Sequence, residues 1–235
     1  MRVPPAAVLA GGLGTRLGSL ARGGPKALVE VNGEPFLGHQ LRLLASKGVR
    51  EAVLCVGHGA GPIKEFVGDG SRWGLRARFS EDGPVLLGTG GALKKALPLL
   101  GSEFWVTYGD AYLDTDYARV LAAFEQTRPK ALMTVYKNEG RWVTSNARLE
   151  GSRVAAYDKA DRSGTFHHVD WGLLLLSAAA LAGVPEGIPA DLSDALKTLA
   201  AAGELAGVEV MEPFYEVGTP DGVTRTAEKL KELKW

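Results

Sequence analysis

Short apolar runs that read as β-strands alternate with helical stretches along most of the chain, and this alternation restricts the fold more than any other feature. Strands are expected at residues 6–10, 52–56, 75–79, 104–108 and 131–136, with helices between them at residues 36–44, 63–67, 91–97 and 116–126. Such alternation favours a mostly parallel sheet with helices on both faces. The sequence therefore predicts a Rossmann-like α/β fold with a mostly parallel, mixed sheet.

The second half of the chain is less regular. Strands are expected at residues 154–157, 169–177 and 208–211, and helices at residues 192–202 and 220–233. The sequence contains no internal repeat, low-complexity tract or long linker that would separate domains. We therefore expect a single domain over residues 1–235.

Composition argues against several classes of function. The 27 basic and 27 acidic residues cancel, so the overall charge does not attract nucleic acid or an anionic membrane. No segment reaches the ~20 apolar residues of a membrane span, and the apolar start of the chain lacks a recognisable cleavage site. The single cysteine, Cys55, lies in an apolar run that favours a buried, inert thiol. We expect a cytoplasmic protein without disulfides, zinc, nucleic-acid partners or membrane partners.

A glycine-rich loop, Gly11-Gly12-Leu13-Gly14, directly follows the first expected strand. Glycines let backbone N–H groups approach an anion closely, so phosphate is the natural ligand. The dinucleotide fingerprint fails at Leu17, and the Gly-Lys-Ser/Thr of a P-loop is absent from the sequence. Arg16 could bind phosphate bidentately, and Lys26 could do so as a mobile charge. A tight structural turn followed by two solvated cations is the alternative.

Several segments together resemble the sugar-phosphate nucleotidyltransferases. Residues 9–17 (LAGGLGTRL), Pro25-Lys26 and residues 31–37 (VNGEPFL) are similar to the signature of this family. Residues 87–93 (LGTGGAL), Tyr108-Gly109-Asp110 and residues 216–220 (EVGTP) match further segments in the right order. The chain looks like the short form without a carboxyl-terminal β-helix. It is most similar to D-glycero-D-manno-heptose 1-phosphate guanylyltransferases, and also resembles N-acetylmuramate 1-phosphate uridylyltransferases and hexose 1-phosphate guanylyltransferases.

The resemblance implies an enzyme that joins a nucleoside triphosphate to a sugar 1-phosphate and releases pyrophosphate, with Mg²⁺. The expected pair is GTP with a heptose or hexose 1-phosphate, and UTP with N-acetylmuramate 1-phosphate is the alternative. The nucleotide side would occupy residues 1–130 and the sugar-phosphate side residues 131–235. Envelope polysaccharide biosynthesis is the implied pathway, and we expect a monomer or a homodimer.

The resemblance also implies which residues bind the nucleotide. Three of them are assigned catalytic roles: Arg16 at the β and γ phosphates, Lys26 at the α phosphate, and Asp110 as a metal ligand. The full nucleotide-binding set comprises Leu9, Ala10, Gly11, Gly12, Gly14, Thr15, Arg16, Lys26, Gly88, Thr89 and Asp110. Gly88 and Thr89 resemble the segment that contacts the nucleobase, and a helix cap with flexible glycines is the alternative.

Asp110 and Glu216 are the implied ligands of Mg²⁺. The family usually has aspartate where this chain has Glu216. Glutamate is longer by one methylene, and octahedral Mg²⁺ tolerates misplaced ligands poorly. Binding by Glu216 could therefore be direct, weaker or mediated by water.

The implied sugar-phosphate residues are Gly109, Asp158, Lys159, Asp170 and Gly172. Lys159 would reach the sugar phosphate, and Asp158 is either a sugar contact or part of a solvated strand-end pair. Asp170 stands where relatives commonly have asparagine, which suggests an altered acceptor preference.

The histidines do not point to a particular function, and His39 is expected on the surface of its helix.

Two other functions compete with transferase activity. One is a catalytically weakened relative that binds nucleotides or sugars for regulation, suggested by Glu216 and Asp170. The other is a Rossmann-type oxidoreductase, which the broken glycine fingerprint disfavours.

Overall fold

The computed structural model describes residues 3–12, 24–57, 59–138 and 143–232. Within them, a nine-stranded sheet has the order β5-β4-β1-β6-β11-β8-β12-β10-β9. The strands in that order are β5 (Arg76–Glu81), β4 (Glu51–Val56), β1 (Ala6–Leu9), β6 (Glu103–Tyr108), β11 (His168–Ser177), β8 (Ala131–Lys137), β12 (Leu205–Val210), β10 (Arg153–Tyr157) and β9 (Ala147–Glu150). Two further strand pairs are β2 (Glu30–Val31) with β3 (Glu34–Pro35), and β7 (Ala111–Tyr112) with β13 (Tyr215–Glu216).

The strands of the first half are parallel, as the alternating pattern predicts. β5, β4, β1 and β6 run parallel to one another. β11 is antiparallel to both β6 and β8, and β12 is parallel to β8. The predicted mixed α/β sheet is confirmed.

Helices cover both faces of this sheet. One face packs against α1 (Phe36–Ser46), α2 (Ala60–Val67) and α4 (Tyr117–Thr127), and the other against α3 (Gly88–Leu100) and α5 (Leu192–Ala201). Alternate residues of a strand serve the two cores: Val8 packs with the first group, whereas Ala7 packs with the second. Short 3₁₀ helices span Lys26–Leu28 (η2), Ser71–Trp73 (η3) and Ala178–Leu181 (η4).

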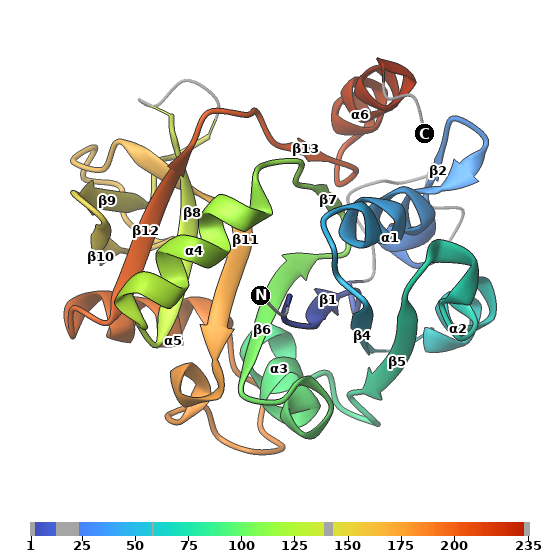
Figure 1. Cartoon of the computed structure of the whole chain (residues 1–235), viewed down its shortest axis with the longest axis horizontal. Coiled ribbons are helices and arrows are strands. Elements are labelled where there is room, and N and C mark those ends of the chain that lie inside the picture. Colours follow the sequence, from blue (N-terminus) through green and yellow to red (C-terminus); the bar gives the residue numbers. More distant parts are fainter. Residues whose placement is uncertain (1–2, 13–23, 58, 139–142, 233–235) are drawn as a thin grey trace.

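The last helix, α6 (Pro220–Glu232), returns the end of the chain to its first half (Figure 1). It lies near α1 and the β2–β3 hairpin, on the opposite side of the molecule from β9 and β10 (Figure 1). A small separate core joins these parts through Val31, Phe36, Val217 and Leu230. The carboxyl-terminal segment is thereby brought beside the residues that follow η2.

Two sequence expectations need correction. β12 begins at Leu205 rather than 208 and ends at Val210, leaving Met211 outside the strand. Gly207 pairs with Met133 in this strand, and the position takes glycine because a Cβ there would lie 3.0 Å from Val154 and closer still to Leu149. His39 is not a surface residue: only 7% of it is exposed, because α1 is wedged between the β2–β3 hairpin and the sheet.

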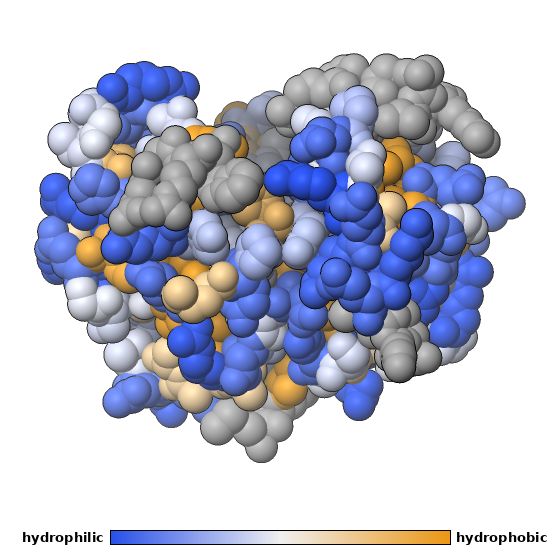
Figure 2. Space-filling view, turned by 90° about the horizontal axis from the view of Figure 1, so that it is seen from above, coloured by the Kyte–Doolittle hydropathy of each residue, from blue (hydrophilic) through white to orange (hydrophobic). Residues whose placement is uncertain are grey.

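None of the described helices is both long and apolar enough to cross a membrane. Seen from above, hydrophilic side chains cover most of the visible face, with smaller hydrophobic areas between them (Figure 2).

Candidate active site

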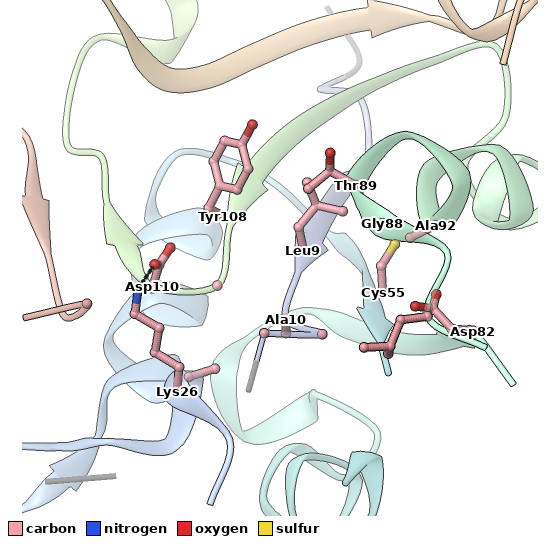
Figure 3. A pocket seen from close by; sticks show the side chains of 16 residues that line it. Leu9, Ala10, Lys26, Cys55, Asp82, Gly88, Thr89, Ala92, Tyr108 and Asp110 are labelled. Atoms are coloured by element: carbon pink, nitrogen blue, oxygen red, sulfur yellow. Dashed lines mark hydrogen bonds and ion pairs between the residues drawn. The ribbon is translucent and has the colours of Figure 1, made fainter. Parts of the chain in front are cut away.

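A cavity of about 400 Å³ opens where β1 and β6 end. Its wall is built from segments that are far apart in the sequence. Ligand sites of α/β proteins typically lie in this position, at the carboxyl ends of the parallel strands. The lining residues are Leu9, Ala10, Gly11, Gly12, Lys26, Ala27, Cys55, Asp82, Leu86, Gly88, Thr89, Ala92, Tyr108, Gly109, Asp110 and Gly218 (Figure 3).

This cavity brings together most of the residues assigned to the nucleotide. Leu9, Ala10, Gly11, Gly12, Lys26, Gly88, Thr89 and Asp110 all line it. Gly109, assigned to the sugar phosphate, lies there too. Gly14, Thr15 and Arg16 lie outside the described residues. The other four sugar-phosphate residues and Glu216 are not part of the wall.

Lys26 and Asp110 form an ion pair at one side of the cavity (Figure 3). Lys26 begins η2, whereas Asp110 belongs to the turn between β6 and β7, so the pair joins positions 84 residues apart. The Lys26 side chain is 14% exposed and that of Asp110 is 30% exposed. Limited contact with water strengthens the electrostatic effect of both charges on a ligand. The cavity therefore presents one cation and one carboxylate at the same point.

Gly109 is required by the close approach of β1 and β6. A Cβ at this position would lie 3.0 Å from Ala10 Cα and 3.1 Å from Leu9 O. The Gly109 N–H donates to Leu9 O at 2.9 Å, which continues the strand pairing into the turn. Asp110, the next residue, is thus positioned beside the carboxyl end of β1, where the chain turns out of the sheet.

The turn that carries Asp110 is also held from α1, by Gln40. The Gln40 Nε2 group donates to Tyr108 O at 2.7 Å and to Ala111 O at 2.8 Å, and these two carbonyls flank Gly109 and Asp110. Gln40 is 1% exposed, so neither bond is exchanged easily for water. Sequence analysis did not single out Gln40, because a glutamine inside an amphipathic helix carries no signal of such a contact.

Glu216 reaches the same region through the β7–β13 pair. Glu216 is opposite Ala111 in this pair, and Val217 N–H donates to Asp110 O at 2.9 Å. Its carboxylate accepts hydrogen bonds from Gly218 N–H and, at 2.7 Å, from the Thr219 hydroxyl. Both carboxylate oxygens therefore face the N-terminus of α6, where a negative charge is favourable.

The carboxylates at the site are compatible with a Mg²⁺ ion whose other ligands come mainly from substrate phosphates. The described residues contain no group of three or more His, Cys, Asp or Glu side chains arranged around a common metal position. Mg²⁺ often takes only one or two carboxylates together with phosphates and water. Asp110 lies on the cavity wall and fits this role, whereas Glu216 already accepts hydrogen bonds from Gly218 N–H and the Thr219 hydroxyl, just before α6.

Thr89 connects the cavity with the second half of the chain. Its hydroxyl donates to Asp191 Oδ1 at 3.1 Å and accepts from Leu192 N–H at 2.8 Å. The Lys159 ammonium lies 3.9 Å from the same Asp191 oxygen and 6.0 Å from the ring centre of Tyr108. Lys159 therefore lies next to two groups of this wall: Tyr108, which lines the cavity, and Asp191, which is bonded to Thr89.

Asp158 pairs with Lys197 and does not line the cavity. Its carboxylate pairs with Lys197 at 2.6 Å and accepts from Ala160 N–H at 2.8 Å. The hydrogen bond from Lys197 is the main cause of its lowered pKa. Asp158 therefore pairs with Lys197 rather than with the adjacent Lys159, which lies near Asp191.

Asp170 is held in a bend of β11. Its carboxylate accepts from Gly172 N–H at 2.9 Å and from the Tyr157 hydroxyl at 3.2 Å. The β11–β8 register shifts between Asp170 and Leu174, and Gly172 has a positive φ of 96°. Loss of hydration raises the pKa of Asp170, which the charge of nearby Lys159 partly offsets.

Asp82, Tyr108, Cys55 and Gly218 line the cavity without having been assigned a role in it from the sequence. Asp82 lies immediately before a glycine, so its position by itself suggests only a turn. Burial raises the pKa of Cys55 to about 12, with a smaller contribution from the Asp82 charge. The prediction of an inert Cys55 thiol agrees with this environment.

The chain matches known proteins over most of its length. N-acetylmuramate α-1-phosphate uridylyltransferase of Caulobacter vibrioides is 30% identical over 241 residues, covering 97% of each chain. D-glycero-α-D-manno-heptose 1-phosphate guanylyltransferase of Campylobacter jejuni is 37% identical over 116 residues, which are 49% of this chain and 51% of that relative.

A solved structure agrees with the architecture described above. HddC of Yersinia pseudotuberculosis, complexed with GMP-PN, gives a TM-score of 0.80 at 25% identity and covers 97% of this chain and 100% of its own. Residues 6–211 also match the model of a protein family described as "MobA-like NTP transferase domain". The family expected from the sequence motifs is confirmed: the chain belongs to the family of MobA-like NTP transferase domains.

Proposed function

We propose that this chain joins GTP to a heptose or hexose 1-phosphate, forming a nucleotide sugar and pyrophosphate. The observation that carries the proposal is the single cavity in which Lys26, Asp110 and two glycine segments meet. The Campylobacter jejuni relative is a guanylyltransferase and HddC was solved with GMP-PN, which favours a guanine nucleotide. The product would belong among the nucleotide sugars used for cell-envelope polysaccharides.

The reaction needs no side-chain nucleophile, because the sugar phosphate already has an anionic oxygen. That oxygen would attack the α phosphorus in line, forming a new P–O bond as the bond to the bridging oxygen breaks. Pyrophosphate then leaves with the electron pair. Lys26 would stabilise the charge at the α phosphate, and Arg16 would hold the departing phosphates.

Asp110 would hold Mg²⁺, with Glu216 as a second and less direct ligand. Once bound, the ion would neutralise charge on the nucleotide phosphates. The contacts of Glu216 with Gly218 N–H and Thr219 favour a contribution through water or through the position of α6. The carboxylate of Asp110 would exchange part of its ion pair with Lys26 for the metal and the substrate.

The acceptor would bind on the Tyr108 side of the cavity. Lys159 lies there and would attract the sugar phosphate, since its Asp191 partner is 3.9 Å away and both side chains are partly exposed. Gly109, Asp170 and Gly172 would complete this side, with Asp170 as a hydrogen-bond acceptor for sugar hydroxyls.

A second candidate is UTP with N-acetylmuramate 1-phosphate. It is favoured by the Caulobacter vibrioides uridylyltransferase, which aligns with 97% of this chain.

Pyrophosphate release from a matrix of substrates tests these proposals. GTP, UTP, CTP, dTTP and ATP are each combined with heptose, mannose, glucose and N-acetylmuramate 1-phosphates, in Mg²⁺ and in EDTA. Release that needs both substrates and Mg²⁺ supports the enzyme. Nucleotide binding without release from any pair would instead favour the regulatory relative.

A further inference from the structure

Residues 188–192 connect the two halves of the molecule beside the candidate cavity. Ala190 N–H donates to Leu87 O at 2.9 Å, and Ala190 O accepts from Gly90 N–H at 2.9 Å. The approach is so close that a Cβ at Gly88 would lie 2.7 Å from Ala190 O. The start of α3, which lines the cavity, and the start of α5 are therefore fixed to each other.

Asp191, the residue that caps α5 at this junction, has a firmly held carboxylate. Its Oδ1 accepts hydrogen bonds from Ser193 N–H at 2.8 Å and from the Thr89 hydroxyl at 3.1 Å. Burial raises the pKa of Asp191, but the hydrogen bonds from Ser193 and the nearby charge of Lys159 lower it by more. This carboxylate is consequently ionised at neutral pH and directed by both helices.

Lys159 is the cation that faces this carboxylate. Its ammonium lies 3.9 Å from Asp191 Oδ1 and 6.0 Å from the ring centre of Tyr108, on the cavity wall. The hydroxyls of Tyr108 and Thr89 point the same way, away from Lys26 (Figure 3). Because a distance of 3.9 Å is too long for a hydrogen bond, Asp191 attracts the ammonium without occupying its donors. Those donors stay free for a phosphate.

α5 also binds the residue before Lys159. Lys197, on the same helix as the Asp191 cap, pairs with the Asp158 carboxylate at 2.6 Å. The two pairs have opposite polarity, since α5 offers a carboxylate to Lys159 and an ammonium to Asp158. Any exchange of partners would bring like charges together. The charges of α5 therefore favour one orientation of the corner that follows β10.

We propose that Asp191 is a positioning residue, which directs the Lys159 ammonium toward the acceptor side of the cavity. The inference rests on the proposed function in that a sugar phosphate binds there. It goes further by assigning the orientation of Lys159 to the cap of α5 and, through Thr89, to the helix start that lines the cavity. A lysine that is already oriented loses less conformational freedom when it binds a phosphate.

The charge of Asp191 also repels an acceptor phosphate. Removing this charge takes away a repulsion and an ordering effect at once, and the two oppose each other in the affinity for the acceptor. Only the ordering effect governs how the attacking oxygen is aligned. The signature of a positioning role is therefore a decrease in kcat that exceeds any increase in KM for the sugar phosphate.

The order of the Lys159 side chain can be measured without any turnover, by ¹³C relaxation of the ε-methylene groups in lysine-labelled protein. Lys159→Arg identifies the signal by its loss. In Asp191→Asn the side-chain oxygen can still accept from Ser193 N–H and the Thr89 hydroxyl, but the charge is gone. The Lys159 signal should then become as mobile as that of an exposed lysine such as Lys231. Unchanged order would overturn the proposal.

Steady-state kinetics with the sugar 1-phosphate that responds best provide the second measurement. Asp191→Asn should lower kcat about tenfold, whereas the KM for the sugar phosphate should rise by less than about threefold. Added to Lys159→Met, the same change should have no further effect on kcat, because the side chain that it positions is gone. An equal effect of Asp191→Asn with and without Lys159 would contradict the inference.

Asp116 provides a matched control for changes at a helix cap. It precedes α4, its carboxylate accepts the Arg119 N–H at 3.0 Å, and it does not line the cavity. Asp116→Asn should leave both the order of Lys159 and kcat unchanged. An equal loss in this variant would show a general effect of helix capping and would reject a specific role for Asp191.

The two measurements separate this inference from the proposed function. Order of Lys159 that is lost in Asp191→Asn, without pyrophosphate release by wild type from any substrate pair, would support the positioning role and reject the transferase. Turnover by wild type, with Lys159 order and kcat both unaffected by Asp191→Asn, would do the reverse.

Discussion

Replacing Gln40 with leucine tests whether α1 holds the Asp110 turn in place. The change removes hydrogen bonds of 2.7 Å to Tyr108 O and 2.8 Å to Ala111 O, and leaves these partly buried carbonyls without that donor. It also removes Oε1, a buried acceptor without a partner among the described residues, which offsets part of the loss. The net destabilisation should be about 2–4 kcal/mol, since a lost buried hydrogen bond costs roughly 1–3 kcal/mol. For a chain of this size that corresponds to a decrease in Tm of about 5–15 °C.

The effect on catalysis should exceed what lost stability explains. A small displacement of Asp110 misplaces the reacting phosphates, so kcat should fall at least roughly tenfold at a temperature where the variant is fully folded. Leu121→Ala, in the core beneath α4, is a control of similar cost, about 2–5 kcal/mol. It should lower Tm without a matching loss of kcat. Differential scanning calorimetry and steady-state kinetics measure both quantities. An equal loss of kcat in the two variants, or an unchanged kcat in Gln40→Leu, would refute the positioning role.

Three further predictions concern single side chains. Lys26→Ala should lower kcat by about 100-fold or more, because a preorganised charge next to the reacting phosphate is lost; near-wild-type turnover with an unchanged Tm would reject its role. The pKa of Asp170 is raised by burial, so its contribution to stability is present at low pH and is lost as pH rises through that raised pKa. The Tm of Asp170→Asn relative to wild type should therefore increase from acid toward neutral pH, and a constant difference would contradict the assignment. Burial raises the pKa of Cys55 to about 12, so its thiol should react with DTNB only after unfolding, and rapid reaction of native protein would contradict its burial.

The structural features that are formed by residues adjacent in the chain could be predicted from the sequence. The parallel strands, and the positions of the glycine loop and Asp110 at strand ends, follow from local patterns, because strand, turn and ligand loop are adjacent in the chain. The resemblance added the family and the division of roles. Arg16, which it also assigned, lies outside the described residues.

Contacts between distant segments could not be predicted in the same way. Gln40 meets Tyr108 across 68 residues, and Thr89 meets Asp191 across 102 residues. Their partners are decided by how helices pack on the sheet, which local propensity does not specify. His39 was misjudged for the same reason, since its Nε2 lies 3.0 Å from Val31 O in a hairpin too short to recognise from its sequence.

The fate of a labelled phosphate tests the central claim most directly. GTP carrying ³²P at the α or the γ position is incubated with Mg²⁺ and the sugar 1-phosphate that responds best, and the products are separated. Nucleotidyl transfer predicts that α label enters the nucleotide sugar and that γ label appears only in pyrophosphate. Transfer of γ label to the sugar, or release of γ label as inorganic phosphate with α label left in GDP, would contradict the account.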